Sequence, residues 1–413
     1  MDEIRQKDQH ISEQYEDKDV AFHESTYLLS SKQQEERFIK EQFTTPEEMA
    51  KYRAYRKEWH RRSEQLTSGE QPLAVICELV SLCNLKCEMC YTITPEFQDT
   101  VVGSQRMMPW QTVTGIIDEC ARIGVSSLLL SWRGESTMYR VKDESGQTRD
   151  FADALAYARN RGVLEVTSLT NGRMFTPELI EKTVRAQPNW LSFSVDGLDR
   201  DYAKVRKQVK TDNGQDPFKL VMESIQAVIQ LRDKLGQTRP QIRSNTIFPA
   251  IVKDPDGYRK FMEELGIGLV TINEILDYRG AELPVEAISE NWFCQYPFQR
   301  LVVASNGTIL CCPGAHNEES DVVLGRFPGS GVKRTKVDGR EQVTEYPEIS
   351  LYDAWHSPKI EKIRKLHADN KRCDIWACKH CRHGATTNGV TWIPEDWDRE
   401  EMRWTKQKRF RNA

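Results

Sequence analysis

Residues 81–91 read Ser-Leu-Cys-Asn-Leu-Lys-Cys-Glu-Met-Cys-Tyr. This stretch places Cys83, Cys87 and Cys90 in a C-x-x-x-C-x-x-C spacing, directly after an apolar run, Leu73 to Val80, that is typical of a buried strand. Thiolates bind soft metals and iron–sulfur clusters, so the three cysteines can hold three corners of a cubane cluster from one loop. The fourth iron would have no protein ligand, and an open coordination position is where a metal centre carries out chemistry.

A zinc site is the alternative for these cysteines. Structural zinc usually takes four ligands arranged as two pairs, as in C-x-x-C…C-x-x-C. Here the cysteines form an isolated triplet, and Cys77 on the preceding strand is the nearest spare. The spacing favours a cluster and leaves zinc open.

Composition places the chain among globular proteins that bind metals. It has 413 residues, a net charge of −4, 38% apolar and 29% charged residues, which predicts two or three domains and gives no reason to expect nucleic-acid binding. No apolar stretch approaches about 20 residues and the N-terminus is too polar for a secretory signal, so we expect no membrane association and a cytoplasmic location. The 11 cysteines stand in metal-type spacings, which indicates metal binding and not disulfides.

From about Gln71 onward, short apolar runs alternate with amphipathic helical segments, which predicts repeated βα units and a parallel sheet. The predicted strands are Leu73–Val80, Ser127–Trp132, Glu165–Leu169, Trp190–Ser194, Gln241–Ile247 and Leu269–Ile275. Six strands are too few for a closed eight-stranded barrel. Residues 1–70 are highly charged, and Thr45-Pro46-Glu47-Glu48 predicts a helix start within them.

The cysteine triplet and the six βα units resemble the radical S-adenosylmethionine (SAM) superfamily. The resemblance implies an α/β fold with an open, TIM-like partial (β/α)6 barrel, here residues 71–280, after a helical N-terminal extension, residues 1–70. It implies SAM as cofactor and a [4Fe–4S] cluster on Cys83, Cys87 and Cys90, which SAM would chelate at the open iron.

The resemblance also suggests residues that contact SAM. Arg133-Gly134-Glu135-Ser136 resembles the family's Gly-Gly-Glu-Pro motif, which holds the amino group of SAM, although Arg133 and Ser136 depart from it. The family is usually aromatic at the position of Met89, which would pack near the adenine, and Tyr91 follows the third cysteine. Asn273 and Glu274 are lining candidates without a firm role. The remaining expected contacts lie near strand ends or within strand five: Asn171, Ser194, Asp196 and Arg243.

A second cysteine group follows the barrel. Along the chain it contains a Cys, a hairpin with Gly, a Cys-Cys pair, a Trp-bearing helix and a Cys-x-x-Cys. This order resembles the SPASM and twitch extensions of radical SAM enzymes. We therefore expect a domain at 281–384, followed by a tail at 385–413. Two thiolate-bound cubane clusters would need eight cysteines, and six are present, so we expect one auxiliary [4Fe–4S] cluster. The expected ligands are Cys294, Cys312, Cys378 and Cys381, and Cys311 or Cys373 could substitute for one of them. The alternative is a zinc site, to which His380 and His383 could contribute.

The resemblance implies a reaction in which SAM is cleaved to a 5′-deoxyadenosyl radical that takes a hydrogen atom from the substrate. We expect a small sugar-like or aminocyclitol-like substrate, oxidised or epimerised, and an external reductant such as flavodoxin or ferredoxin. One alternative is a peptide maturase that forms a crosslink or a modified residue. A non-catalytic zinc or iron–sulfur protein is a further alternative, of a different class. The sequence identifies no catalytic base.

Overall fold

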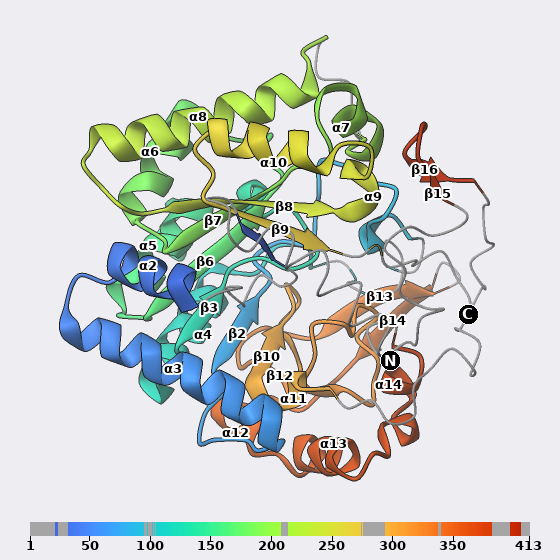
Figure 1. The fold of residues 1–413 in the computed structure, drawn as a ribbon. Helices are drawn as coiled ribbons and strands as arrows, with labels where there is room; N and C mark the ends of the chain where they lie inside the picture. Colours follow the sequence, from blue (N-terminus) through green and yellow to red (C-terminus); the bar gives the residue numbers. More distant parts are fainter. Residues whose placement is uncertain are drawn as a thin grey trace.

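The computed structural model describes residues 21–23, 32–94, 97, 101, 103, 105–207, 214–273, 275, 294–337, 340–381 and 397–405. Within these ranges, a sheet of ten strands in the order β1-β9-β8-β7-β6-β3-β2-β10-β11-β12 runs through the molecule (Figure 1). The sheet carries helices along its outer side, and the C-terminal elements lie beside β2 (Figure 1).

Six consecutive βα strands form the central part of the sheet, and each pairs with its neighbours in parallel. Their bounds are β2 (Ala74–Cys77), β3 (Ser127–Leu129), β6 (Glu165–Thr170), β7 (Trp190–Ser194), β8 (Gln241–Ile247) and β9 (Leu269–Asn273). Nearly all of these residues are buried, which explains their apolar character without strict alternation. The predicted α/β class and the partial (β/α)6 barrel are confirmed.

The helices between the strands follow one another around the barrel, and neighbouring helices pack together. They are α4 (Trp110–Ile123), α5 (Phe151–Asn160), α6 (Pro177–Ala186), α7 (Asp199–Val205), α8 (Pro217–Lys234), α9 (Phe248–Ile251) and α10 (Pro255–Glu264). Asp150, Thr176, Asp216 and Asp254 cap four of them by accepting backbone N–H groups of the first turn. A short hairpin, β4 (Arg140–Lys142) and β5 (Thr148–Asp150), precedes α5.

The N-terminal extension lies against the amino ends of the barrel strands. Its helices are α2 (Lys32–Gln42) and α3 (Pro46–Gln65), and Thr45 caps α3 with a capping box, so the predicted helix start is confirmed. The Tyr52 hydroxyl donates to Glu165 at the start of β6 (3.5 Å), and the α3 residue Trp59 is buried. The sequence did not predict β1 (Ala21–His23), which pairs in parallel with β9.

The C-terminal part continues the barrel sheet. Strand β10 (Arg300–Val303) pairs in parallel with β2, and β11 (Thr308–Leu310) and β12 (Val323–Arg326) follow it antiparallel. The other elements are α11 (Tyr296–Gln299), the hairpin β13 (Lys333–Val337) and β14 (Arg340–Thr344), the helices α12 (Leu351–Trp355), α13 (Pro358–Ala368) and α14 (Trp376–Lys379), and the hairpin β15 (Trp397–Asp398) and β16 (Arg403–Trp404). Of the helices in the described ranges, none has the length and apolarity that crossing a bilayer requires.

Candidate active site

The cysteine loop leaves the carboxyl end of β2 and is fixed by backbone hydrogen bonds. Val80 forms a bridge with Met107, and the Cys90 amide donates to the Cys87 carbonyl (2.9 Å). All three thiols are free, and Cys87 is buried. Burial raises the pKa of Cys83 well above its usual range, and the nearby Glu135, Cys87 and Cys90 raise it further, so the three predicted cysteines lie together.

Gly134 and Glu135 hold the end of β3 against this loop. A Cβ on Gly134 would lie 2.2 Å from the Val80 carbonyl oxygen, so only glycine allows this approach. The Glu135 amide donates to the Leu82 carbonyl (2.8 Å). The two predicted residues therefore contact the backbone of the cysteine loop.

The Glu135 carboxylate is buried and accepts several hydrogen bonds. Its Oε1 accepts the Thr137 amide and the hydroxyls of Thr137 and Thr170, whereas its Oε2 accepts the Asn171 amide at 2.6 Å. Asn171 in turn donates through Nδ2 to Asn84 (2.7 Å) and approaches the Cys83 sulfur at 3.9 Å. The Glu135 carboxylate thus joins the ends of β3 and β6, and the Asn171 side chain links them to the cysteine loop.

Asp196 lies just beyond the carboxyl end of β7. Its Oδ1 accepts the Ile247 amide at 2.8 Å, and its Oδ2 accepts from Arg206, the residue that follows α7. The Arg206 Nη1 lies 3.7 Å from the Cys87 sulfur. The half-buried Ser194 ends β7, beside Asn245 of β8. The structure therefore brings Asp196 to the cysteine loop through Arg206, a residue that the sequence analysis did not single out.

Met89 and Tyr91 contact C-terminal segments. Met89 packs against an apolar cluster that includes Trp397 and Trp404 of the β15–β16 hairpin, and the Trp404 indole donates to the Glu88 carbonyl (3.1 Å). The Tyr91 ring stacks on His316, with ring centroids 5.1 Å apart, and its hydroxyl donates to Asn317. The hairpin of the C-terminal tail therefore packs on the cysteine loop.

Arg243 is the predicted site residue that the structure does not bring to this group. It lies near the amino end of β8, with its guanidinium over the rings of Trp190 (4.5 Å) and Phe38 (5.1 Å). Alternation along the strand points it toward the N-terminal helices. Asn273 donates to Asn245 (2.7 Å), and Glu274 lies outside the described residues.

The second cysteine group also assembles. Burial raises the pKa of Cys294 to about 12, and Cys381 and Cys311 add to the shift. The pKa of Cys312 is likewise raised by burial and by four neighbouring thiols, those of Cys294, Cys381, Cys311 and Cys378. The four predicted ligands therefore lie close to one another, with Cys311 beside them. Cys373 is half-buried.

His367 on α13 joins two of these cysteines, and the sequence analysis missed it. Its Nδ1 accepts the Cys294 amide (3.1 Å), and its Nε2 lies 3.5 Å from the Cys378 sulfur. Burial lowers the pKa of His367 to about 4, so the ring is neutral at pH 7, and a neutral ring that accepts at Nδ1 carries its proton at Nε2. His367 therefore donates to Cys378. The His380 ring lies 4.6 Å from that of Trp376 at a tilt of 40°, and His383 lies outside the described residues.

Residues 78–232 match the model of the radical SAM superfamily. The chain is similar to this superfamily over that range, which is less than half of its length. The matched residues span the cysteine loop and the strands β3, β6 and β7.

Several solved structures are similar to this chain at low sequence identity. BtrN in complex with AdoMet and 2-DOIA is 14% identical, with 75% of this chain and 92% of that chain covered and a TM-score of 0.43. The structure of anSMEcpe with bound AdoMet is 15% identical, with 75% of this chain and 89% of that chain covered and a TM-score of 0.49. The structure of SuiB of Streptococcus suis bound to S-adenosylmethionine is 16% identical, with 82% of this chain and 76% of that chain covered and a TM-score of 0.42. No protein of curated function matches the sequence. Similarity at this level carries no argument about the reaction of this chain.

The cysteine loop of this radical SAM domain fits an iron–sulfur cluster. Free thiols lie together in one loop, and the sulfurs of Cys83 and Cys87 have side-chain N–H donors nearby, Asn171 and Arg206. Among the described side chains, no three metal-binding groups converge on a single-ion position. In a cluster each thiolate binds its own iron, so convergence on one point is not required.

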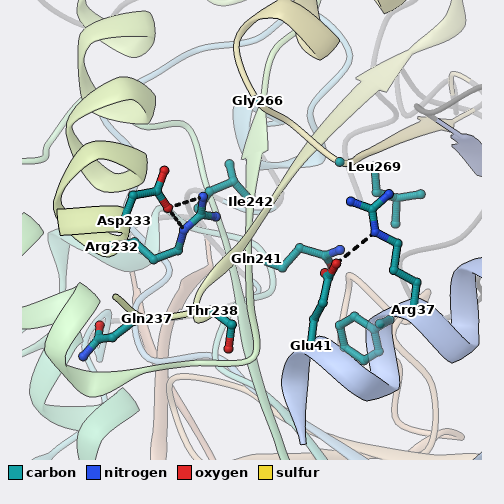
Figure 2. A pocket seen from close by; sticks show the side chains of 12 residues that line it. Arg37, Glu41, Arg232, Asp233, Gln237, Thr238, Gln241, Ile242, Gly266 and Leu269 are labelled. Atoms are coloured by element: carbon teal, nitrogen blue, oxygen red, sulfur yellow. Dashed lines mark hydrogen bonds and ion pairs between the residues drawn. The ribbon is translucent and has the colours of Figure 1, made fainter. Parts of the chain in front are cut away.

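A cavity of about 370 Å³ lies at the opposite end of the radical SAM barrel (Figure 2). It is lined by the first residues of β8 and β9, Gln241 and Leu269, and by α2. Arg37 pairs with Glu41 and Arg232 pairs with Asp233 along its wall (Figure 2). Parallel α/β folds bind ligands at the carboxyl ends of their strands, so we do not assign this cavity to the active site.

Proposed function

We propose that this chain uses a [4Fe–4S] cluster on Cys83, Cys87 and Cys90 to cleave SAM and abstract a hydrogen atom from a small carbohydrate-like substrate, which is then oxidised or epimerised. The observation that carries the proposal is that the cysteine loop contacts Gly134-Glu135 and Asn171 at the carboxyl ends of β2, β3 and β6. When bound, the reduced cluster supplies the electron that cleaves SAM to methionine and the 5′-deoxyadenosyl radical.

Glu135 and the residues around it would hold the methionine end of SAM. Oε1 already accepts three hydrogen bonds and Oε2 accepts one, so Oε2 retains capacity for an ammonium donor. Gly134 leaves its backbone open beside this oxygen. We assign the SAM ammonium to Glu135 and the neighbouring carbonyl groups.

The nucleoside end of SAM would lie toward the ends of β7 and β8. Ser194 and Asn171 offer polar groups to the ribose and carboxylate, and Asp196 orients Arg206. Met89 and Tyr91 would contribute apolar contacts near the adenine. Arg243 is not included in this assignment because it lies near the other end of β8.

The second cysteine group would hold one auxiliary [4Fe–4S] cluster in a SPASM- or twitch-like arrangement, with Cys294, Cys312, Cys378 and Cys381 as ligands. The mutual proximity of these thiols supports the assignment, and His367 would donate to the Cys378 sulfur. Anaerobically reconstituted protein should then carry about eight irons per chain. About four irons together with one zinc would indicate a zinc site at this position.

The first test is the formation of 5′-deoxyadenosine from SAM by reconstituted, chemically reduced protein. A Cys83→Ala, Cys87→Ala, Cys90→Ala variant should form none, whereas Cys120→Ala, which changes a buried cysteine of α4 outside both cysteine groups, should retain the activity. A SAM-binding measurement separates a protein that needs substrate for cleavage from one that does not bind SAM. Absence of both SAM binding and cleavage in a cluster-loaded wild type would refute the proposal.

The substrate class is tested by label transfer. Deuterated sugars and aminocyclitols that pass deuterium into 5′-deoxyadenosine would support a small-molecule substrate. The alternative, a peptide maturase, predicts that such compounds give no transfer and that a deuterated peptide does. Neither the described N-terminal helices nor the sequence of residues 1–70 resembles a strand-rich peptide-recognition domain, which favours the small molecule.

A further inference from the structure

Arg206 is placed between a carboxylate and a cysteine sulfur. On one side its guanidinium donates to Asp196, and on the other its Nη1 lies 3.7 Å from the Cys87 sulfur. The Asp196 side chain is 1% exposed and that of Arg206 is 15% exposed. The guanidinium therefore acts on the sulfur in a region that is largely shielded from water.

The segment that carries Arg206 is fastened to the cysteine loop. The Lys86 amide donates to the Lys207 carbonyl at 2.6 Å, and the Lys207 ammonium pairs with Glu88. The Arg206 amide closes α7 by donating to the Tyr202 carbonyl (2.8 Å). Because contacts on both sides fix the backbone, the approach of Arg206 to Cys87 does not depend on a mobile side chain alone.

The guanidinium carries its positive charge to the Cys87 sulfur, with its Nη1 3.7 Å away, and it binds the Asp196 carboxylate through its other nitrogens. Asp196 also receives the Ile247 amide, which disperses part of its negative charge. A sulfur that carries negative charge is therefore stabilised by its surroundings at this position.

Reduction of a [4Fe–4S] cluster adds one electron, and no bond to the protein forms or breaks. Hydrogen bonds to cluster sulfurs and nearby positive charge stabilise the more negative, reduced state and raise the reduction potential. Low local polarity strengthens this effect.

We propose that Arg206 raises the reduction potential of the SAM-binding cluster through Cys87, with Asp196 as the residue that orients it. The electron comes from a one-electron donor of the flavodoxin or ferredoxin class, and Arg206 keeps its proton throughout. The inference rests on the proposed cluster at Cys83, Cys87 and Cys90. It assigns to Arg206 a positioning and tuning role, which is separate from SAM binding.

The test is a potentiometric titration of the cluster, followed by electron paramagnetic resonance, in Arg206→Gln and in the charge-balanced double variant Asp196→Asn, Arg206→Gln. The signal to follow is the one that changes on SAM addition and is absent from Cys87→Ala. We expect the ratio of reduced to oxidised cluster at a fixed potential to fall about tenfold in Arg206→Gln, which for one electron is a shift of about 59 mV. The ratio should fall less in the double variant, because the opposing charge of Asp196 is lost as well. Arg200→Gln is the matched control, because Arg200 lies exposed on α7 and its loss changes the net charge equally.

Iron content and SAM affinity are measured on the same samples. An unchanged potential in both variants overturns the inference and leaves the proposed function intact. Loss of the cluster from both variants, with the cluster retained in Arg200→Gln, also overturns it, because Arg206 would then hold the loop and not tune the cluster. A wild type without any SAM-responsive cluster signal refutes the proposed function itself.

Discussion

Arg133 and Glu318, which are 185 residues apart, form a buried ion pair with 2.9 Å between Nη2 and Oε1. Arg133 also binds Glu78 at the end of β2 (2.7 Å), and Glu318 also binds Lys333 (2.8 Å). Two acidic and two basic side chains thus balance one another away from water. The pair ties the loop before Gly134-Glu135 to the loop that follows β11, and it explains why this chain has arginine where the family motif has glycine.

Removal of Arg133 should destabilise the protein strongly. Arg133→Gln leaves the Glu78 and Glu318 carboxylates buried together without the guanidinium, and breaking a buried pair in this way costs about 3–5 kcal/mol. Anaerobic urea denaturation measures the change in the free energy of unfolding. The control is Arg161→Gln, which removes a surface pair with Asp118 and should cost less than about 1 kcal/mol. Equal costs for the two variants would contradict the role of the network.

Glu319 should make stability depend on pH near neutrality. Its Oε2 is buried without a hydrogen-bond partner among the described residues, and burial together with Asp321 and Glu318 raises its pKa to about 7 from the ordinary 4.5. Between these values the native state holds a proton that the unfolded state has released, so the stability falls as pH rises. In Glu319→Gln this loss should be absent.

The difference in unfolding free energy between Glu319→Gln and the wild type should therefore grow by about 3 kcal/mol as the pH rises from 4.5 to 8, and then level off. Glu318→Gln is the neighbouring control with the opposite sign. Arg133 and Lys333 outweigh the burial of Glu318 and lower its pKa, so this variant should be less stable than the wild type at pH 7 and approach it at low pH. A pH-independent difference for Glu319→Gln would show that its carboxyl group titrates normally.

Gly134→Ala should abolish SAM binding. The added Cβ would lie 2.2 Å from the Val80 carbonyl oxygen and 2.7 Å from that of Leu82, so the cysteine loop and the Glu135 segment must separate. Isothermal titration with SAM measures the effect, and we expect at least a tenfold loss of affinity. Gly268→Ala is a suitable control, since its Cβ would meet only the Gln241 side chain at 3.8 Å. Normal affinity in Gly134→Ala would exclude a tight contact at this position.

Trp404→Ala should expose the cysteine loop. The indole packs with Trp397 and Met402 in the cluster that covers Met89, and its N–H donates to the Glu88 carbonyl. Loss of the ring should detach the hairpin and speed hydrogen exchange across residues 397–405. It should also accelerate bleaching of the proposed iron–sulfur cluster by oxygen severalfold. Trp404→Phe keeps an aromatic ring, although a smaller one, and loses one hydrogen bond, so its effect should be smaller, about 1 kcal/mol. Equal bleaching of the wild type and Trp404→Ala would argue against a covering role.

The local parts of the fold could be predicted from the sequence because local signals determine them. Apolar runs marked the strands, and β7 and β8 begin and end where predicted, while Thr45 and Pro46 marked the start of α3. The C-x-x-x-C-x-x-C spacing indicated the first thiol group. These features depend on neighbours within a few residues, so no knowledge of the tertiary structure was needed.

Long-range placement could not be predicted in the same way. Arg243 stands in a strand like the other candidates, but its position near the amino end of β8 directs it to Phe38 and Trp190. Arg206 contacts the Cys87 sulfur, 119 residues away, and His367 contacts the Cys378 sulfur, 11 residues away. No local sequence pattern predicts such contacts. The pairing of β1 with β9 likewise depends on tertiary structure alone.

Strand β10 hydrogen-bonds β2 directly, from Arg300↔Ala74 to Val303↔Cys77. Without β10, β2 would become an open sheet edge immediately before the cysteine loop, and open edges invite pairing with other chains. The C-terminal part therefore cannot be exchanged for another domain without opening this edge of the barrel sheet. Chimaeras that join this barrel to another protein's cluster domain would have to carry β10 and its register across the junction.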